Sequence, residues 1–79
     1  MNEYLSASDA RAVTPSDTVS YDGRAARGLY VGGGGDVSLL TDAGAAVTFT
    51  GLLAGSILPV RHTRVNSTGT TATNLVALF

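Results

Sequence analysis

Short runs of alternating apolar and polar residues, separated by glycine-rich turns, make up most of the chain after residue 24. Alternation with a period of two is typical of β-strands that bury one face. The runs that show it best lie near residues 27–31, 37–41, 45–50, 57–65 and 73–79. Short strands at regular spacing with turn signals between them indicate a small sandwich or barrel. The sequence therefore predicts an all-β fold, a small antiparallel β-sandwich or barrel of about five to six strands.

The turns between these runs predict which strands pair. Four consecutive glycines at 32–35 fit a tight hairpin turn, and residues 42–44 carry a second turn signal. The link of Asn, Ser, Thr and Gly before residue 73 suggests that the last two runs form a hairpin. Inward-facing positions give the expected core, with the faces of the last strands left open because a bulge would exchange them. That core comprises Leu29, Val31, Val37, Leu39, Val47, Phe49, Leu58, Val60, Leu75, Ala77 and Phe79.

Residues 1–24 differ from the rest because they show no sustained period of two or of 3.6. Pro15 disfavours helix at the residue before it, so the segment is interpreted as an extended N-terminal arm ahead of a β domain at residues 25–79. A disordered terminus is the alternative. Scattered apolar side chains favour a docked arm, because they gain most when they find a partner surface. They are Tyr4, Leu5, Val13, Val19 and Tyr21.

Length and composition predict an oligomer. A domain of 79 residues buries only roughly 60% of the surface that its unfolded chain exposes. The chain has no Cys, so no disulfide can add stability. Charged residues make up 14% of the chain, against about 25% in ordinary soluble domains. The low charge leaves a surface made of Gly, Ala, Ser and Thr. Such a surface is typical of a subunit that neighbouring subunits cover, so we expect a homo-oligomer.

Several function classes are disfavoured by what the sequence contains. Five Arg, no Lys and six acidic residues give a net charge of -1, which offers no basic footprint for nucleic acid. No apolar run approaches the ~18 residues of a membrane span, and the start lacks the features of a signal peptide, so synthesis and assembly in the cytosol are expected. The glycine run at 32–35 lacks the Gly-Lys-Ser/Thr of a phosphate loop. We predict no catalytic residues, no cofactor and no metal, and hence no enzyme.

Charged residues near the fourth predicted strand form the candidate subunit interface. Arg61 and Arg64 can form bidentate pairs with carboxylates across a subunit boundary, and Asp36 and Asp42 are the candidate partners. His62, the one histidine, is assigned to the same strand and interface. The alternative is that the two arginines are solvated and prevent unwanted edge pairing.

Ordered segments of the chain resemble a known family. The segments are VTPSDT (13–18), RGLYVGGGGDV (27–37), VTFTGLLAGSILPVR (47–61), TRV (63–65), TGTTAT (68–73) and VALF (76–79). Together they resemble the head spike base proteins of phages and phage-derived gene transfer agents. The resemblance implies a structural virion protein on the capsid surface, a homopentamer at the fivefold vertices that binds the major capsid protein and anchors a spike or fibre protein.

The resemblance also implies a role for the N-terminal arm, which would dock on the capsid. The residues assigned to that docking are Tyr4, Leu5, Val13, Pro15, Val19 and Tyr21. The alternative function is a capsid decoration or cement protein, with a trimer as the alternative oligomer, that stabilises the shell without carrying a fibre. A carbohydrate-binding fibre tip is a third class, for which few aromatic residues are available.

Overall fold

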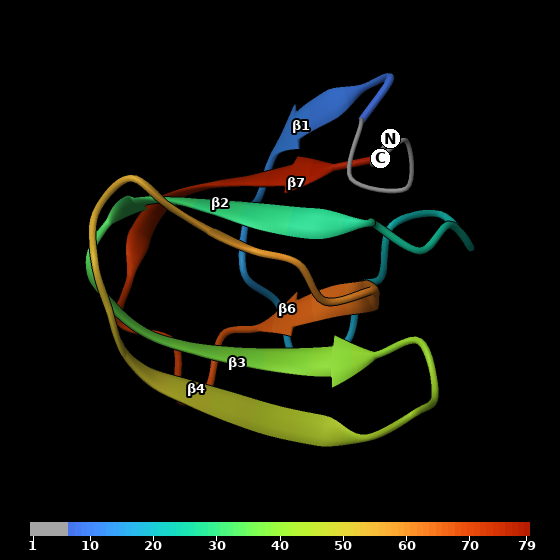
Figure 1. Cartoon of the computed structure of the whole chain (residues 1–79). Coiled ribbons are helices and arrows are strands. Elements are labelled where there is room, and N and C mark those ends of the chain that lie inside the picture. The colour runs from blue at the N-terminus through green and yellow to red at the C-terminus, as the bar shows by residue number, and fades with distance from the viewer. Residues whose placement is uncertain (1–6) are drawn as a thin grey trace.

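A computed structural model describes residues 7–79, which form two antiparallel sheets that face each other (Figure 1). The first sheet has the order β1-β7-β2-β5, and the second has the order β4-β3-β6. Within residues 7–79 there is no helix. The predicted all-β fold is confirmed, with seven strands. They are β1 (Ala10–Ala12), β2 (Gly28–Gly33), β3 (Gly35–Thr41), β4 (Ala46–Leu52), β5 (Ser56–Leu58), β6 (His62–Asn66) and β7 (Thr73–Leu78).

The core between the sheets follows from the alternation of the strands. Leu29 on β2 lies opposite Ala77 on β7, and both are fully buried. Leu39 on β3 lies opposite Val65 on β6 in the second sheet. Most of the predicted core is confirmed as buried, namely Leu29, Val31, Val37, Leu39, Leu75, Ala77 and Phe79. Three predicted members are only partly buried, namely Phe49, Leu58 and Val60.

One predicted core residue is wrong and several were missed. Val47 is 38% exposed because β4 is an edge strand, so the sandwich covers its inward side incompletely. The side chains that are buried but were not in the expected core are Ala26, Ser38, His62, Val65, Asn66 and Ala72.

Two predicted hairpins are wrong. The glycine run at 32–35 does not join paired strands, because β2 and β3 belong to different sheets and the chain crosses between them. A β-carbon on Gly35 would lie 2.8 Å from the Ala72 backbone nitrogen, so glycine is needed for this close crossing. The last two runs do not pair either, since β6 pairs with β3 while β7 pairs with β2 and β1. The run at 57–65 is interrupted at Pro59, which cannot donate to a ladder, and its two parts join different sheets.

The turn at 42–44 does join paired strands, as its sequence signal indicates. β3 and β4 form a hairpin in which the Gly44 backbone N–H donates to the Thr41 carbonyl at 2.9 Å. The Thr41 N–H donates to the Ala45 carbonyl at 2.8 Å. The pairing of β3 with β4 could be predicted from sequence because the short turn between them fixes it locally.

The described part of the N-terminal segment packs along its own domain. After β1 the chain leaves the first sheet and descends to the edge of β6 in the second sheet (Figure 1). The Val13 backbone N–H donates to the Leu75 carbonyl at 2.9 Å, and the Ser16 N–H donates to the Val65 carbonyl at 2.9 Å. The Tyr21 N–H donates to the Thr63 carbonyl at 3.0 Å. The segment therefore closes one side of the sandwich and covers the β6 edge.

Candidate assembly site

His62, assigned to the candidate subunit interface, lies in the core of its own chain, and its role between subunits stays a prediction. Its side chain is fully buried. Nδ1 lies 2.8 Å from the Val60 carbonyl oxygen, and Nε2 lies 3.0 Å from the Tyr21 hydroxyl oxygen. A carbonyl can only accept, so Nδ1 carries the proton and the neutral ring accepts from Tyr21 at Nε2. Burial lowers the pKa of His62 and raises the pKa of Tyr21, so both side chains are kept neutral.

An aromatic cluster holds the N-terminal segment against the end of β7. The Tyr21 ring meets the rings of His62 and Phe79 edge to face, each at 5.4 Å between centroids. The Arg24 guanidinium lies 4.5 Å from the centre of the Phe79 ring and that of Arg11 lies 5.3 Å from it. Tyr21 is thus engaged inside its own chain, although it was assigned to capsid docking.

The other residues assigned to the docking arm are distributed unevenly. Val13 is partly buried and packs against the core, and Pro15 is half-buried. Val19 is 68% exposed, so among these described residues it presents the most apolar surface to a partner. Tyr4 and Leu5 lie outside the described residues. Docking by Val19 stays a prediction.

The charged residues assigned to the interface make contacts within one chain. Arg61 Nε lies 3.6 Å from Asp42 Oδ2, and the two side chains are 62% and 52% exposed. Arg64 Nε donates to Asn66 Oδ1 at 2.8 Å. Asp36 Oδ1 accepts from the Gly51 backbone N–H at 2.9 Å. Asp42 was a candidate partner of Arg61 across a subunit boundary, but within one chain this pair links the turn after β3 to the start of β6, and a role between subunits stays a prediction.

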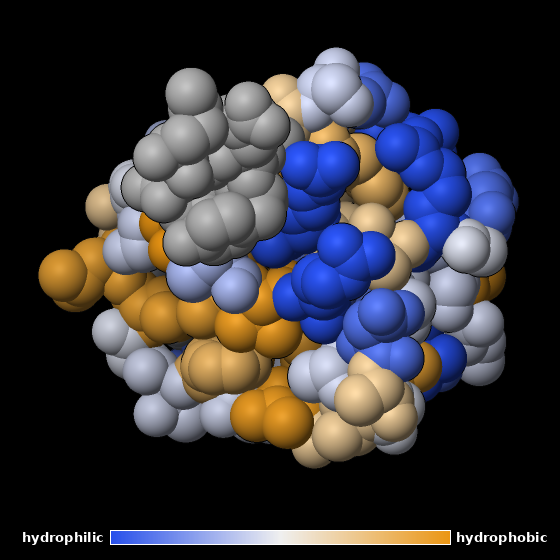
Figure 2. All heavy atoms as spheres, turned by 45° about the vertical axis from the view of Figure 1, so that its right-hand side comes forward, coloured by the Kyte–Doolittle hydropathy of each residue, from blue (hydrophilic) through white to orange (hydrophobic). Residues whose placement is uncertain are grey.

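The outer face of the first sheet is apolar, although sequence reasoning assigned no site there. Val76 lies opposite both Tyr30 and Ala12, and Ile57 lies opposite Tyr30, so these four form one row across all four strands. Tyr30 is 38% exposed and Ile57 is 60% exposed. In Figure 2 hydrophobic residues likewise gather in one area of the visible surface, beside hydrophilic ones. We call the row of Ala12, Val76, Tyr30 and Ile57 the outer apolar row.

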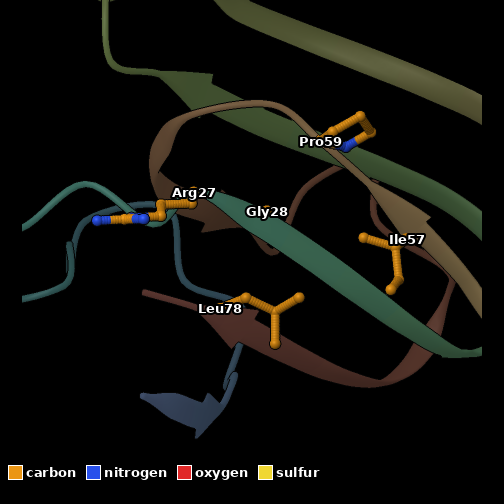
Figure 3. Close-up of a pocket in the computed structure, with 5 residues that line it drawn as sticks. All are labelled: Arg27, Gly28, Ile57, Pro59 and Leu78. Carbon is orange, nitrogen blue, oxygen red and sulfur yellow. The ribbon is translucent and has the colours of Figure 1, made fainter. Parts of the chain in front are cut away.

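A shallow hollow of about 290 Å³ adjoins this row. Gly28 has no side chain, so β2 leaves a gap between the side chains of β5 and β7 (Figure 3). Figure 3 shows Ile57 and Leu78 on either side of β2, Pro59 above them, and the Arg27 guanidinium extending away from the others. We call this feature the β2 hollow. Its lining is mostly apolar, with one cation at the rim.

Leu53 is the most exposed of the large apolar residues that the structure describes. It lies in the turn between β4 and β5 and is 75% exposed. The glycines that bracket it, Gly51 and Gly55, have φ of 68° and 84°, which tight turns require. The sequence signal for the exposure of Leu53 is its position between two turn glycines. Turns lie at the surface, so an apolar residue there is expected to be exposed.

Among residues 7–79 no group of three or more His, Cys, Asp or Glu side chains is arranged to hold a metal ion. No helix in the described part of the chain could span a membrane. Buried side-chain nitrogen and oxygen atoms of the described residues all have hydrogen-bond partners. What these residues offer most clearly is a surface for assembly: an apolar row, a hollow and an exposed leucine.

Comparison with solved structures finds a close relative of the whole fold. A chain of the structure described as "Capsid of native GTA particle computed with C5 symmetry", where GTA stands for gene transfer agent, superposes with a TM-score of 0.81. The two chains share 43% sequence identity, and the match covers 94% of this chain and 84% of that chain. No family model matches the chain, and no curated protein matches it.

Proposed function

This chain belongs to the same family as that chain of the gene transfer agent capsid, and from this premise we propose that it is a head spike base protein. In the coarser sense it is a structural capsid protein with a non-enzymatic role, of the phage and gene transfer agent kind. The single observation that carries this is the 43% identity over 94% of the chain. The finer role is that of a ring on the capsid surface that anchors a spike or fibre.

The surface of the domain supports assembly with other subunits. The outer apolar row leaves Ile57 60% exposed and Tyr30 38% exposed, and Leu53 adds a third exposed side chain. Burying apolar surface stabilises an assembly by about 25 cal/mol per Å², so contact with a partner at these positions is favoured. Few charges oppose such covering, because only 14% of the residues are charged.

The oligomer proposed is a pentamer at the fivefold vertices of the capsid. The capsid that contains the relative was computed with C5 symmetry, so a fivefold arrangement is available in that particle. A ring uses two different surfaces of each subunit, one for each neighbour. The domain supplies several candidates, which include the outer apolar row and the exposed turn at Leu53.

The major capsid protein is the proposed partner below the ring. Val19 is the described arm residue that is free to contact it, since Val13 and Tyr21 pack within their own chain. Deleting residues 1–20 would remove β1 and the hydrogen bonds of Val13 and Ser16 as well as the arm. Val19→Asp is therefore the sharper variant, because it changes an exposed side chain and leaves the backbone contacts in place.

The test is association with particles. A tagged copy of the chain is expressed in cells that make the capsid, and the particles are purified on a density gradient and washed at high salt. We expect the wild-type chain to co-purify with the particles and Val19→Asp to be depleted from them. A wild-type chain found only in the soluble fraction would contradict the proposed function. Particle association together with a trimer in solution would favour a decoration or cement protein that carries no fibre.

A further inference from the structure

We propose that copies of this chain join head to tail, with Leu53 of one copy inserted into the β2 hollow of the next. The inference rests on the proposed oligomeric capsid role and specifies the contact that builds the oligomer. The occupant of the hollow is thus a second copy of the same chain. Three observations support it: a fixed apolar knob, a hollow of suitable size, and their separation on the molecule.

The knob is held in place by the backbone. The Gly55 N–H donates to the Val31 carbonyl at 2.6 Å, which ties the turn to β2. The Ser56 N–H donates to the Leu53 carbonyl at 3.1 Å and closes the turn. Leu53 is therefore presented at 75% exposure on an anchored turn. Little ordering entropy remains to be lost when such a side chain binds.

The hollow has the size and chemistry to receive a leucine. Its volume is about 290 Å³. An apolar cavity of about 150 Å³ already admits benzene, so a leucine side chain has room. Gly28 forms the floor, and Ile57, Pro59 and Leu78 supply apolar walls. Ile57 is 60% exposed, and an inserted leucine would cover part of it.

Leu53 cannot fill the hollow of its own chain. A β-carbon on Gly34 would lie 3.7 Å from the Leu53 carbonyl carbon, which places the knob beside the Gly34 end of β2. The hollow lies at Gly28, the other end of the same strand. Leu53 does not line the hollow, and it is 75% exposed, so its own side chain leaves the hollow open. The contact must be made by another copy, and a contact between two different surfaces can close into a ring.

Charge favours a second copy as the occupant. Arg27 lies at the rim of the hollow. Near the knob, the Asp36 carboxylate accepts from the Gly51 N–H at 2.9 Å, two residues before Leu53. Insertion of the turn would bring a carboxylate toward a guanidinium, the pairing that planar arginine favours.

Two single variants and their mixture test this contact. Leu53→Ser removes the knob and leaves the hollow intact. Ile57→Arg blocks the hollow and leaves the knob intact. Both residues are mostly exposed, so the fold should persist, which thermal unfolding verifies. Ala43→Ser is the control, because Ala43 is exposed in the turn between β3 and β4 and belongs to neither surface. Native mass spectrometry measures the mass of each sample.

The head-to-tail contact predicts a distinctive outcome. Wild type and Ala43→Ser should give the ring mass, whereas Leu53→Ser and Ile57→Arg should each give the monomer. Mixing the two defective variants should give a one-to-one dimer, since the mixture keeps one intact knob and one intact hollow that can meet. Rings in either single variant, no dimer in the mixture, or a monomeric wild type would overturn the proposal. Failure here with particle association intact would leave the capsid role standing, whereas intact rings that do not associate with particles would contradict that role instead.

Discussion

Phe79 provides the most direct test of how the sandwich is held together. Its side chain is 3% exposed and packs with Ala26 and Ala77 in the core cluster at the end of β7. Its ring meets Tyr21 edge to face at 5.4 Å and lies 4.5 Å from the Arg24 guanidinium. Phe79→Ala would remove the ring and all of these contacts while the backbone strand remains.

The size of the effect can be worked out from burial. A phenylalanine buries about 150–250 Å², which at about 25 cal/mol per Å² corresponds to about 4–6 kcal/mol. Measured Phe→Ala changes in cores cost about 3–5 kcal/mol. The whole 79-residue domain is expected to be stable by about 4–12 kcal/mol. Phe79→Ala should therefore remove about a quarter or more of the free energy of unfolding.

Urea denaturation measures this loss, with all proteins compared at one concentration because assembly would couple stability to concentration. Phe79→Leu retains most of the volume and loses only the ring contacts, so it should cost about 1–2 kcal/mol. Val47→Ala is the second comparison and should cost less, since Val47 is 38% exposed. A loss below about 1 kcal/mol for Phe79→Ala, or one equal to that of Val47→Ala, would refute the view that Phe79 anchors the end of β7.

Three further predictions follow from individual contacts. Burial lowers the pKa of His62 below 6.5, so the unfolded chain binds more protons and the free energy of unfolding should fall as the pH is lowered through 6.5; a flat profile in urea titrations would contradict a buried neutral ring. Gly35→Ala should destabilise the domain by about 1–3 kcal/mol, because φ is 154° and the new β-carbon would lie 2.8 Å from the Ala72 nitrogen; an unchanged thermal midpoint would refute this. Asp17 accepts from the Thr68 N–H at 2.9 Å, so Asp17→Asn should speed hydrogen exchange at the Thr68 amide while core amides stay protected, and equal rates would show that this contact does not hold the loop.

The strands could be predicted from the sequence, but their partners could not. Alternation places Leu29 and Val31 inward whichever strand lies beside them. Pairing depends on where the chain crosses between layers, and two of the four crossings among the described strands lie at places that look like ordinary turns. One is the glycine run at 32–35, and the other is the link between β6 and β7. Only the β3–β4 turn determines a local hairpin, because it closes its own hydrogen bonds at Thr41.

The surface was predicted less well than the core, for a physical reason. Arg61 and Asp42 were predicted to face each other across a subunit boundary, whereas they lie 3.6 Å apart within one chain. The apolar features were missed because an exposed leucine and a buried one look alike in a sequence. In the sequence, Leu53 is distinguished from the core leucines by the turn glycines that bracket it, and in the structure by the hydrogen bonds that anchor its turn. His62 was assigned to the subunit interface because its hydrogen-bond partner Tyr21 is 41 residues away in the chain and gives no local signal of a buried contact.

Density on intact particles tests the capsid role most directly. Maps of particles with and without this chain are compared, and the two-layer fold is fitted to the difference. The account predicts that the difference forms a fivefold ring on the outer surface at the fivefold vertices. A difference located elsewhere on the shell, a threefold ring, or no difference at all would contradict it.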